Sequence, residues 1–236
     1  ENRWNVLVCH RRFGKTVCMI NHLIRSALLS KNKNPRYAYI APTFKQAKSI
    51  AWDYMKQFTA KIPYTKFNET ELRVDLPNGS RITLLGSENS DGLRGIYLDG
   101  CVIDEYANVN ERLFPEIIRP ALSDRKGYCV FIGTPQGMNN NFYELYQHAQ
   151  GADDWFNYKA KASDTKIVDD EELVKAKEVM GDKKYLQEFE CDWIANIEGA
   201  VYSDVLAKME DKKQLTRVPY DPSLPVSTAW DLGVSD

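Results

Sequence analysis

Two short groups of residues in this chain have the types and spacing that phosphate chemistry requires. The first is the tripeptide Gly14-Lys15-Thr16, which stands where an apolar run, residues 3–9, gives way to a stretch with helical spacing, residues 17–29. Backbone N–H groups at the start of a helix point toward an anion, and the helix dipole favours negative charge there. We therefore expect a phosphate-binding loop, with Lys15 on the β- and γ-phosphates and the Thr16 hydroxyl as a ligand of Mg²⁺.

This loop departs from the usual spacing at its first position. The usual pattern has a glycine five residues before the Gly-Lys pair, and Cys9 stands there instead. A small side chain can turn at that point, although a positive φ would be strained for cysteine. The residues between are expected to contact the nucleotide as well: His10, Arg11, Arg12 and Phe13. Either Arg11 or Arg12 could touch the γ-phosphate where charge develops, and the other is then a solvated loop charge. The alternative for the whole loop is a chance tripeptide.

The second group is a pair of acids, Asp104 and Glu105, directly after the apolar run 101–103. Hard oxygen ligands suit Mg²⁺, so we expect Asp104 to hold the cation. Glu105 would polarise the attacking water as a general base. Adjacent acids are common by chance, and the alternative is two solvated residues that cap the strand.

Two further residues carry weaker signals. Thr134 follows the apolar run 128–133, and a hydroxyl beside a γ-phosphate could sense its loss and pass that on to a moving element. The alternative is a plain turn, because Gly, Thr and Pro all suit turns. Arg94 lies between glycines in a polar loop, residues 87–95, and could reach the nucleotide of a neighbouring subunit as an arginine finger. It could equally contact DNA or only water.

These residues need a sheet edge to bring them together. The pattern predicts strands at 3–9, 37–41, 71–76, 81–85, 100–104 and 128–133, with the two central ones forming a hairpin around Pro77-Asn78-Gly79-Ser80. It predicts helices at 17–29, 43–58 (capped by Thr43), 110–122, 141–149 and 171–190. Short strands that alternate with helices indicate an α/β fold, with a mostly parallel sheet covered on both faces. Such sheets bind ligands at the carboxyl ends of their strands.

Composition limits the class of protein. The chain has 236 residues, of which 43% are hydrophobic and 27% charged, which is an ordinary globular balance. Its apolar runs are far shorter than a membrane span needs. The five cysteines and three histidines have no metal-ligand spacing, so we expect buried, reduced thiols. The chain opens with Glu1 and no signal peptide, and we interpret it as a fragment trimmed at its front.

Charge is unevenly distributed. The net charge is −2, yet residues 1–90 hold 15 Lys and Arg against 6 Asp and Glu, whereas residues 91–236 hold 16 against 27. The basic part would be available to phosphates, or the two parts could simply neutralise each other in the folded protein.

We expect three sections along the chain: a phosphate-binding domain at 1–198, a linker at 199–225 with three prolines near its end, and the start of another domain at 226–236. The last section contains Asp231 on a short apolar strand. A strand-borne Asp followed by Gly and a second Asp could begin a two-metal nuclease site, although its partners would lie outside this sequence. The alternative is a surface strand end.

Five motifs in order resemble the large terminase subunit of tailed bacteriophages: H-R-R-F-G-K-T, G-L-R-G, V-I-D-E-Y-A, G-T-P-Q-G and A-W-D-L-G-V-S-D. The resemblance implies an N-terminal P-loop ATPase of the additional-strand catalytic-glutamate class, followed by a nuclease with a ribonuclease-H-like fold. It implies ATP and Mg²⁺ as cofactors. It further implies that the ATPase drives double-stranded DNA into an empty capsid and that the nuclease cuts concatemeric DNA.

The resemblance assigns roles to residues of this sequence. Arg11 or Arg12 would be the arginine acting in cis, Arg94 the one acting in trans, Thr134 the coupling residue and Asp231 the first nuclease aspartate. Adenine contacts normally come from just upstream of the loop, where Arg3 and Trp4 are weak candidates. Cys9 is a departure that such terminases are expected to tolerate.

Partners follow from the same resemblance: double-stranded DNA, the portal protein, the small terminase subunit and further copies in a ring on the procapsid. We expect no membrane association and a location in the host cytoplasm. This fragment should not cleave DNA, because the nuclease is nearly absent. Two alternatives stay open, namely a helicase-like DNA-dependent ATPase and a nucleotide-gated DNA-binding module without turnover.

Overall fold

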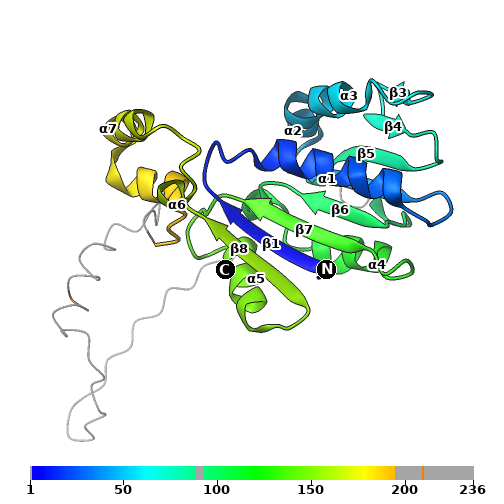
Figure 1. The fold of residues 1–236 in the computed structure, drawn as a ribbon. Coiled ribbons are helices and arrows are strands. Elements are labelled where there is room, and N and C mark those ends of the chain that lie inside the picture. Colours follow the sequence, from blue (N-terminus) through cyan, green and yellow to red (C-terminus); the bar gives the residue numbers. More distant parts are fainter. Residues whose placement is uncertain (1, 89–92, 195–208, 210–236) are drawn as a thin grey trace, which may run out of the picture. The chain divides into compact units, whose positions relative to one another are not determined.

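The computed structural model describes residues 2–88, 93–194 and 209 (Figure 1). Contacts between Cα atoms divide the chain into two units, residues 1–198 and 199–236. Only the first unit is described below. The expected linker at 199–225, apart from residue 209, and the expected strand with Asp231 lie outside the described residues.

An eight-stranded sheet forms the middle of the first unit (Figure 1). Its strands are β1 (Trp4–Cys9), β2 (Arg36–Ala41), β3 (Lys66–Asn68), β4 (Arg73–Asp75), β5 (Arg81–Gly86), β6 (Gly100–Ile103), β7 (Tyr128–Gly133) and β8 (Trp155–Ala160). Their order is β3-β4-β5-β2-β6-β7-β1-β8. The six strands from β5 to β8 in that order are parallel, and β3 and β4 are antiparallel additions. The prediction of a mostly parallel α/β sheet is confirmed.

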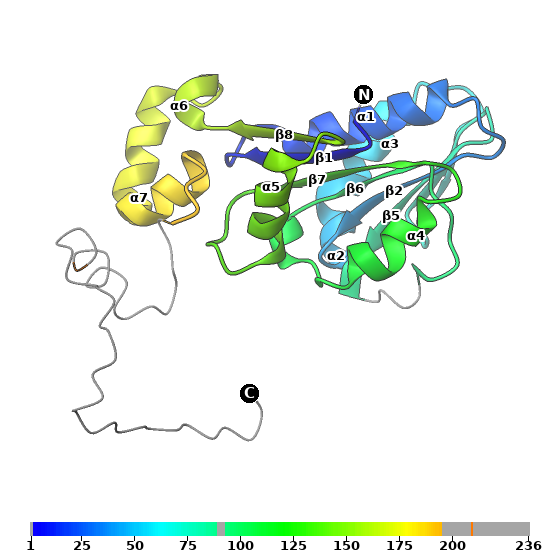
Figure 2. The ribbon, with the colours of Figure 1, turned by 90° about the horizontal axis from the view of Figure 1, so that it is seen from below.

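Helices cover both faces of this sheet (Figure 2). They are α1 (Lys15–Leu29), α2 (Phe44–Ala47), η1 (Lys48–Trp52), α3 (Asp53–Thr59), η3 (Tyr106–Asn108), η4 (Leu113–Ile118), α4 (Arg119–Ala121), α5 (Asn141–Gly151), α6 (Ala162–Thr165) and α7 (Asp170–Phe189). Side chains of α1, η1 and α3 share one buried cluster with alternate residues of the strands. Side chains of η4, α4 and α5 share the other cluster, on the opposite face.

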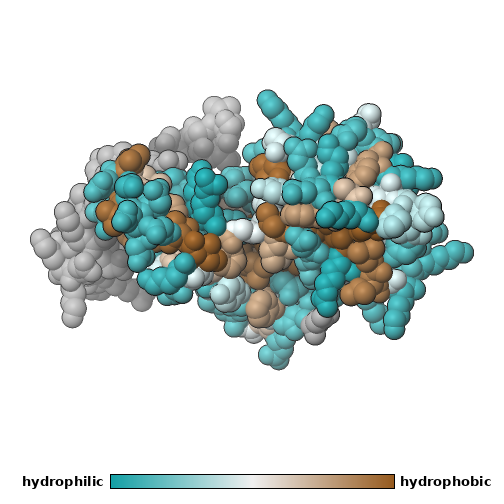
Figure 3. Space-filling view, turned by 45° about the horizontal axis from the view of Figure 1, so that its top comes forward, coloured by the Kyte–Doolittle hydropathy of each residue, from teal (hydrophilic) through white to brown (hydrophobic). Residues whose placement is uncertain are grey.

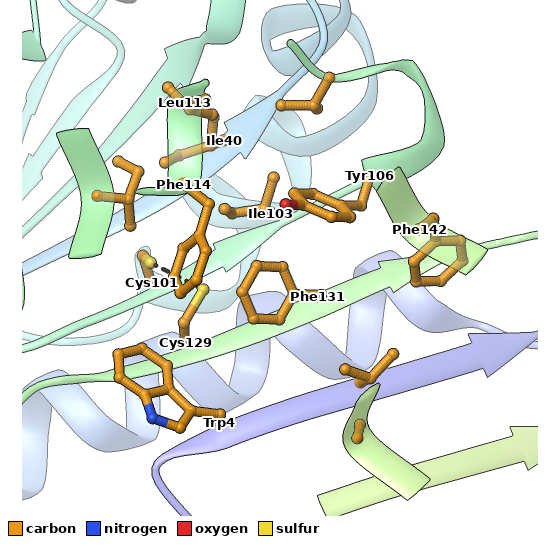
Figure 4. Close-up of a cluster of buried hydrophobic side chains, with 14 of the residues drawn as sticks. Trp4, Ile40, Cys101, Ile103, Tyr106, Leu113, Phe114, Cys129, Phe131 and Phe142 are labelled. Atoms are coloured by element: carbon orange, nitrogen blue, oxygen red, sulfur yellow. Dashed lines mark hydrogen bonds between the residues drawn. The ribbon is translucent and has the colours of Figure 1, made fainter. Parts of the chain in front are cut away.

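The second of these clusters is rich in aromatic rings (Figure 4). Phe131 of β7 lies at its middle, with its ring centroid 4.7 Å from that of Phe114 and 4.8 Å from that of Tyr106, both edge-on. Such pairs contribute about 0.5–1.5 kcal/mol beyond their buried area. Strands β6 and β7, which lead to residues 104 and 134, both contribute buried side chains to this cluster.

The predicted helices and strands match those of the structure, apart from the differences that follow. Thr43 forms the expected capping box with Gln46, but the helix after it contains five π-helical residues, 48–52. The helix expected from 110 begins at Leu113 and is π-helical as far as Ile118. Strands β3 and β8 were not predicted. The sequence of β8, W-F-N-Y-K-A, mixes aromatic and polar residues because β8 is an edge strand with exposed side chains.

The face of the molecule seen in Figure 3 is mainly polar. Figure 3 shows hydrophilic residues over most of the face toward the viewer, with hydrophobic ones gathered in a band across its middle. Within the described ranges, every helix is too short or too polar to cross a bilayer. Four of the five cysteines are buried, Cys18 is exposed, and all five are free thiols, as expected.

Candidate active site

Three neighbouring strands bring the candidate residues to one edge of the sheet. β6, β7 and β1 are adjacent and parallel, so their carboxyl ends, at Ile103, Gly133 and Cys9, lie at the same edge. The phosphate loop therefore starts beside the turn that contains Thr134 and beside the acid pair. Topology alone thus unites segments about 90 and 120 residues apart in the chain.

The Lys15 amino group occupies the middle of this edge. Its Nζ donates to the carbonyl oxygens of Cys9 and His10, both at 3.3 Å, and to Oγ1 of Thr134 at 3.1 Å. Thr134 in turn donates its hydroxyl proton to the Cys9 carbonyl, at 3.2 Å. The predicted sensor hydroxyl is therefore in direct contact with the predicted phosphate-binding lysine.

Asp104 lies opposite the start of α1. The Thr16 hydroxyl donates to its Oδ2 at 3.4 Å, and the backbone N–H of Glu105 donates to its Oδ1 at 2.9 Å. The Tyr39 hydroxyl, from β2, also donates to Oδ2 in a short hydrogen bond. Burial raises the pKa of Asp104, and the bonds from Tyr39 and the Glu105 N–H oppose that rise.

Glu105 has a left-handed backbone, with φ of 47° and ψ of 49°. Non-glycine residues there carry strain of order 1–3 kcal/mol, which often marks functional sites. Its carboxylate makes no hydrogen bond or ion pair with any described residue. Burial raises its pKa, and the charge of Asp104 raises it further, while Lys15 and Arg11 lower it. A carboxylate with a raised pKa is a stronger base at neutral pH.

The phosphate loop is not strained at Cys9. This cysteine ends β1 in extended backbone and is buried, and the left-handed residues of the loop are Arg12 (φ 67°) and Gly14 (φ 88°). The expected strain at the first position is therefore absent, because the strand continues through it. A side chain added at Gly14 would meet no atom within 4 Å, so the space beside the loop is open.

The side chains of His10 and Phe13 are directed away from Lys15. His10 is buried, with Nε2 at 2.8 Å from the Thr165 hydroxyl and Nδ1 at 2.6 Å from the Arg11 carbonyl. Burial lowers its pKa, which favours the neutral ring. The Phe13 ring packs edge-on against it, 5.3 Å away. Their expected contact with phosphate is thus limited to the backbone.

Arg11 and Arg12 differ in their surroundings. Arg12 is exposed. Arg11 forms an ion pair with Glu188 of α7, with 3.7 Å between Nη1 and Oε2, and its backbone N–H donates to the Glu188 carbonyl at 2.8 Å. The neighbouring Gln187 donates from Nε2 to the Pro135 carbonyl at 2.7 Å. Helix α7 therefore contacts both the phosphate loop and the turn after β7.

Three expected residues lie elsewhere. Arg94 is exposed and pairs with Glu116 of η4, at 3.4 Å. Trp4 is buried at the amino end of β1, and Arg3 beside it donates to the carbonyls of Leu122 and Gly127. The expectation that Arg3 and Trp4 contact adenine is wrong, because a whole strand separates them from the phosphate loop and their side chains are used in packing.

Comparison with known proteins identifies the family to which this chain belongs. A sequence model described as "Terminase large subunit, T4likevirus-type, N-terminal" matches residues 9–204. The chain belongs to the large terminase subunit family. The resemblance inferred from the five motifs is therefore confirmed.

Individual relatives agree with this assignment. The large terminase subunit of Thermus phage G20c is 29% identical to this terminase chain in an alignment of 126 residues, and the match covers 45% of this chain and 26% of that protein. The chain thus matches about a quarter of the length of such curated relatives.

Solved structures share the fold. The large terminase ATPase domain of Thermus phage P74-26 superimposes with a TM-score of 0.68 and 21% identity, over 82% of this chain and 89% of that domain. The large terminase of another thermophilic bacteriophage, in complex with ADP, gives 0.71 and 16%, over 82% of this chain and 49% of that one. The terminase chain therefore has the fold of a large terminase ATPase domain.

Sequence reasoning missed three residues of the site in this terminase chain: Tyr39, Gln187 and Glu188. Tyr39 lies on a predicted strand that ends at the ligand-binding edge, but its position alone does not show that its hydroxyl reaches Asp104. Gln187 and Glu188 lie on a predicted helix and are more than 170 residues from the end of the loop, and nothing in the local sequence connects them to it.

Proposed function

We propose that this chain is the ATP-hydrolysing motor domain of a DNA-packaging terminase, which converts ATP and water to ADP and phosphate. One observation carries the proposal: Lys15, Thr16, Asp104 and Glu105 converge at one sheet edge beside open space. Family membership supports it. So does the ADP complex of the thermophilic phage terminase, which has the same fold.

Each side chain has a distinct task in this proposal. Lys15 exchanges its carbonyl partners for the β- and γ-phosphate oxygens, and the N–H groups at the start of α1 hold the same anion. The Glu105 carboxylate accepts a proton from water as the water oxygen attacks the γ-phosphorus. The bond from that phosphorus to the bridging oxygen breaks, and ADP leaves with the electron pair. Lys15 stabilises the charge that develops on the phosphoryl oxygens.

Mg²⁺ suits the oxygen atoms of Thr16 and Asp104, which already lie 3.4 Å apart. When bound, this cation would neutralise charge on the β- and γ-phosphates. Among the described residues, no group of three or more His, Cys, Asp and Glu side chains is arranged to hold a metal. Phosphate oxygens and water are therefore expected to complete the coordination, as is usual for this ion.

The arginines supply further positive charge. Arg11 is our candidate for the γ-phosphate in cis, because an acid already holds its guanidinium near the loop, and Arg12 is the alternative. Arg94 is proposed to act in trans on a neighbouring subunit's nucleotide. Mixing Arg94→Ala chains with Glu105→Gln chains should then restore hydrolysis. The absence of rescue in a demonstrated mixed assembly would count against this role.

The wider function extends beyond this chain. We propose translocation of double-stranded DNA into the procapsid by a ring of copies, together with the portal protein and the small terminase subunit. Residues 1–198 would be the ATPase domain and 199–225 a linker. Residues 226–236, with Asp231, would begin a nuclease that acts only in the full-length protein.

Mg²⁺-dependent ATP hydrolysis tests the central claim. Glu105→Gln and Lys15→Ala should each reduce the rate at least about a hundredfold, whereas Glu111→Gln, an exposed acid nearby, should keep it. Parent-like hydrolysis by both site variants would overturn the assignment. Unwinding of forked DNA would favour a helicase-like ATPase. Nucleotide binding without hydrolysis at any protein concentration would favour a gated binding module.

A further inference from the structure

The phosphate loop contains a buried histidine whose two ring nitrogens both have hydrogen-bond partners. The Nδ1 atom of His10 lies 2.6 Å from the carbonyl oxygen of Arg11, the next residue. Its Nε2 atom lies 2.8 Å from the hydroxyl oxygen of Thr165, at the end of α6. The hydrolysis proposed above gives this ring no task, because the ring is directed away from Lys15.

These two contacts define where the ring proton of His10 lies. A carbonyl oxygen only accepts hydrogen bonds, so the proton is on Nδ1, which donates to Arg11. In a neutral imidazole the other nitrogen is then an acceptor, and the Thr165 hydroxyl donates to it. Burial lowers the pKa of His10, in agreement with a neutral ring. Thr165 therefore selects the tautomer in which His10 holds the Arg11 carbonyl.

The carbonyl that His10 holds belongs to the peptide before a strained residue. Arg12 has a left-handed backbone, with φ of 67°, which is unfavourable for a residue with a Cβ atom. The C=O and N–H of a trans peptide point in opposite directions, so a carbonyl held by the ring directs the Arg12 N–H away from it. Gly14 is also left-handed, and Phe13 between them is not. Such alternation forms a concave nest of N–H groups that binds anions.

The loop has backbone bonds that do not depend on the ring. The Arg11 N–H donates to the Glu188 carbonyl at 2.8 Å, and the Phe13 N–H donates to the His10 carbonyl at 3.3 Å. The same His10 carbonyl accepts a bond from Lys15 Nζ, also at 3.3 Å. These bonds fix the course of the loop, whereas the imidazole fixes the direction of one carbonyl within it. The side chain of His10 therefore has a role that can be separated from folding of the loop.

Thr165 stands on a packed element outside the loop. The helix α6 that carries it is bonded to the end of α7 by the Ser163 hydroxyl, which donates to the Glu190 carboxylate at 2.6 Å. Ala162 of α6 is buried in a small apolar cluster with side chains of α7. The hydroxyl of Thr165 is therefore held in place by α6 and α7. Through His10, that position is passed on to the phosphate loop.

We propose that His10, oriented by Thr165, is a positioning residue that shapes the phosphate loop for the β- and γ-phosphates of the nucleotide. The inference rests on the proposed function in taking residues 9–16 as a phosphate-binding loop. It follows that affinity for phosphate groups depends on a hydroxyl 155 residues away along the chain.

Binding of a fluorescent ATP analogue to the whole chain tests this, together with competition by pyrophosphate, which has phosphates but no base or sugar. Thr165→Val removes the hydroxyl at almost constant volume and should weaken binding of both probes about five- to tenfold, the effect of one lost hydrogen bond. Thr165→Ser should restore the parent affinity. Thr65→Val is the matched control and should bind as the parent does, because it removes a hydroxyl that donates to the Ile62 carbonyl, away from the loop.

Replacement of His10 separates positioning from a merely structural role. Asparagine places an amide N–H about where Nδ1 lies, has no tautomers and is too short to reach Thr165. His10→Asn should therefore bind nucleotide more tightly than His10→Leu, which has no donor. In the His10→Asn background, Thr165→Val should cause no further loss. Nitrogen NMR should place the proton on Nδ1 in the parent and on both nitrogens, in a mixture, in Thr165→Val.

Four outcomes would overturn the proposal: parent-like affinity of Thr165→Val, an equal loss in Thr65→Val, additive losses in the double variant, or a proton on Nε2 of His10 in the parent. Circular dichroism confirms that each variant is folded. The NMR measurement on the parent applies even if a variant fails to fold.

ATP hydrolysis by the parent distinguishes this inference from the proposed function. If the parent hydrolyses ATP and Thr165→Val binds nucleotide as tightly as the parent, the role of His10 fails and the proposed function stands. If the parent binds nucleotide without hydrolysis and Thr165→Val weakens that binding, the proposed function fails and the role of His10 stands.

Discussion

Glu188 of α7 is paired with Arg11 of the phosphate loop, 3.7 Å away, and the same glutamate accepts the Arg11 backbone N–H through its carbonyl. Lys184 holds the other carboxylate oxygen at 3.2 Å. The Glu188 carboxylate is thus paired with the Arg11 guanidinium group, which the proposed function assigns to the γ-phosphate. Nucleotide and α7 are expected to compete for one cation.

Glu188→Gln should tighten nucleotide binding. The change leaves the backbone bond in place but removes the competing charge. An ion pair whose guanidinium group is exposed, as that of Arg11 is, is worth about 0.2–1 kcal/mol, or up to about fivefold in affinity. Titration with a fluorescent ATP analogue measures the effect. Glu178→Gln, an exposed acid on the same helix, is the control. If Glu188→Gln tightens binding equally in an Arg11→Ala background, competition for Arg11 is not the cause.

Tyr39→Phe should impair the use of Mg²⁺. The variant removes a buried hydroxyl that donates to Asp104, and a hydrogen bond to a charged group is worth about 1.5–3 kcal/mol. We expect kcat/KM for MgATP to fall about ten- to a hundredfold and the Mg²⁺ concentration for half-maximal hydrolysis to rise. Tyr37→Phe on the same strand removes a hydroxyl that donates to the Ser26 carbonyl and should have little effect. Equal losses in both variants would contradict a specific role for Tyr39.

The raised pKa of Glu105 has two consequences for pH dependence. Hydrolysis needs the carboxylate, so the rate should fall as pH decreases through the raised value. A carboxyl with a folded pKa above its unfolded one destabilises the fold once ionised, and stability is lost as pH rises through that interval.

Glu105→Gln should therefore raise the melting temperature of the nucleotide-free chain at about pH 8 but not below about pH 4. Thermal unfolding at several pH values checks this, with Glu111→Gln as the control. A stabilisation that is independent of pH would rule out ionisation as its source.

Cys9→Gly should not improve the phosphate loop. Cys9 has extended backbone and a buried thiol, and burial raises its pKa to about 12, so it is a neutral packing group. Glycine in a strand costs about 0.5–1 kcal/mol, and the lost burial adds to this. Chemical denaturation should show a less stable variant with unchanged nucleotide affinity. Markedly tighter binding would mean that the loop does need a glycine there.

Local sequence predicted that the candidate phosphate loop and the acid pair lie at the ends of neighbouring strands. Both are contiguous motifs at strand ends, and parallel strands with ends at one edge leave little freedom in where Lys15 and Asp104 lie. The contacts of Tyr39 and Glu188 could not be predicted in the same way. They depend on which strands are neighbours and on where α7 packs, which no local pattern encodes.

The adenine prediction was wrong for a related reason. Proximity in sequence to the loop suggested Arg3 and Trp4, but a strand carries its first residues to the far edge of the sheet. Strand β8 was missed because exposed edge strands lack the apolar run that marks buried ones.

Both edges of the sheet limit how copies of this chain can associate. At one edge, β3 has only three residues and carries Lys66, and at the other, β8 carries Lys159 near its end. Short strands and lysines discourage another chain from adding its own strand there. Self-association by sheet extension, the usual route to runaway fibres, is therefore disfavoured, and oligomers are expected to form through side-chain contacts instead.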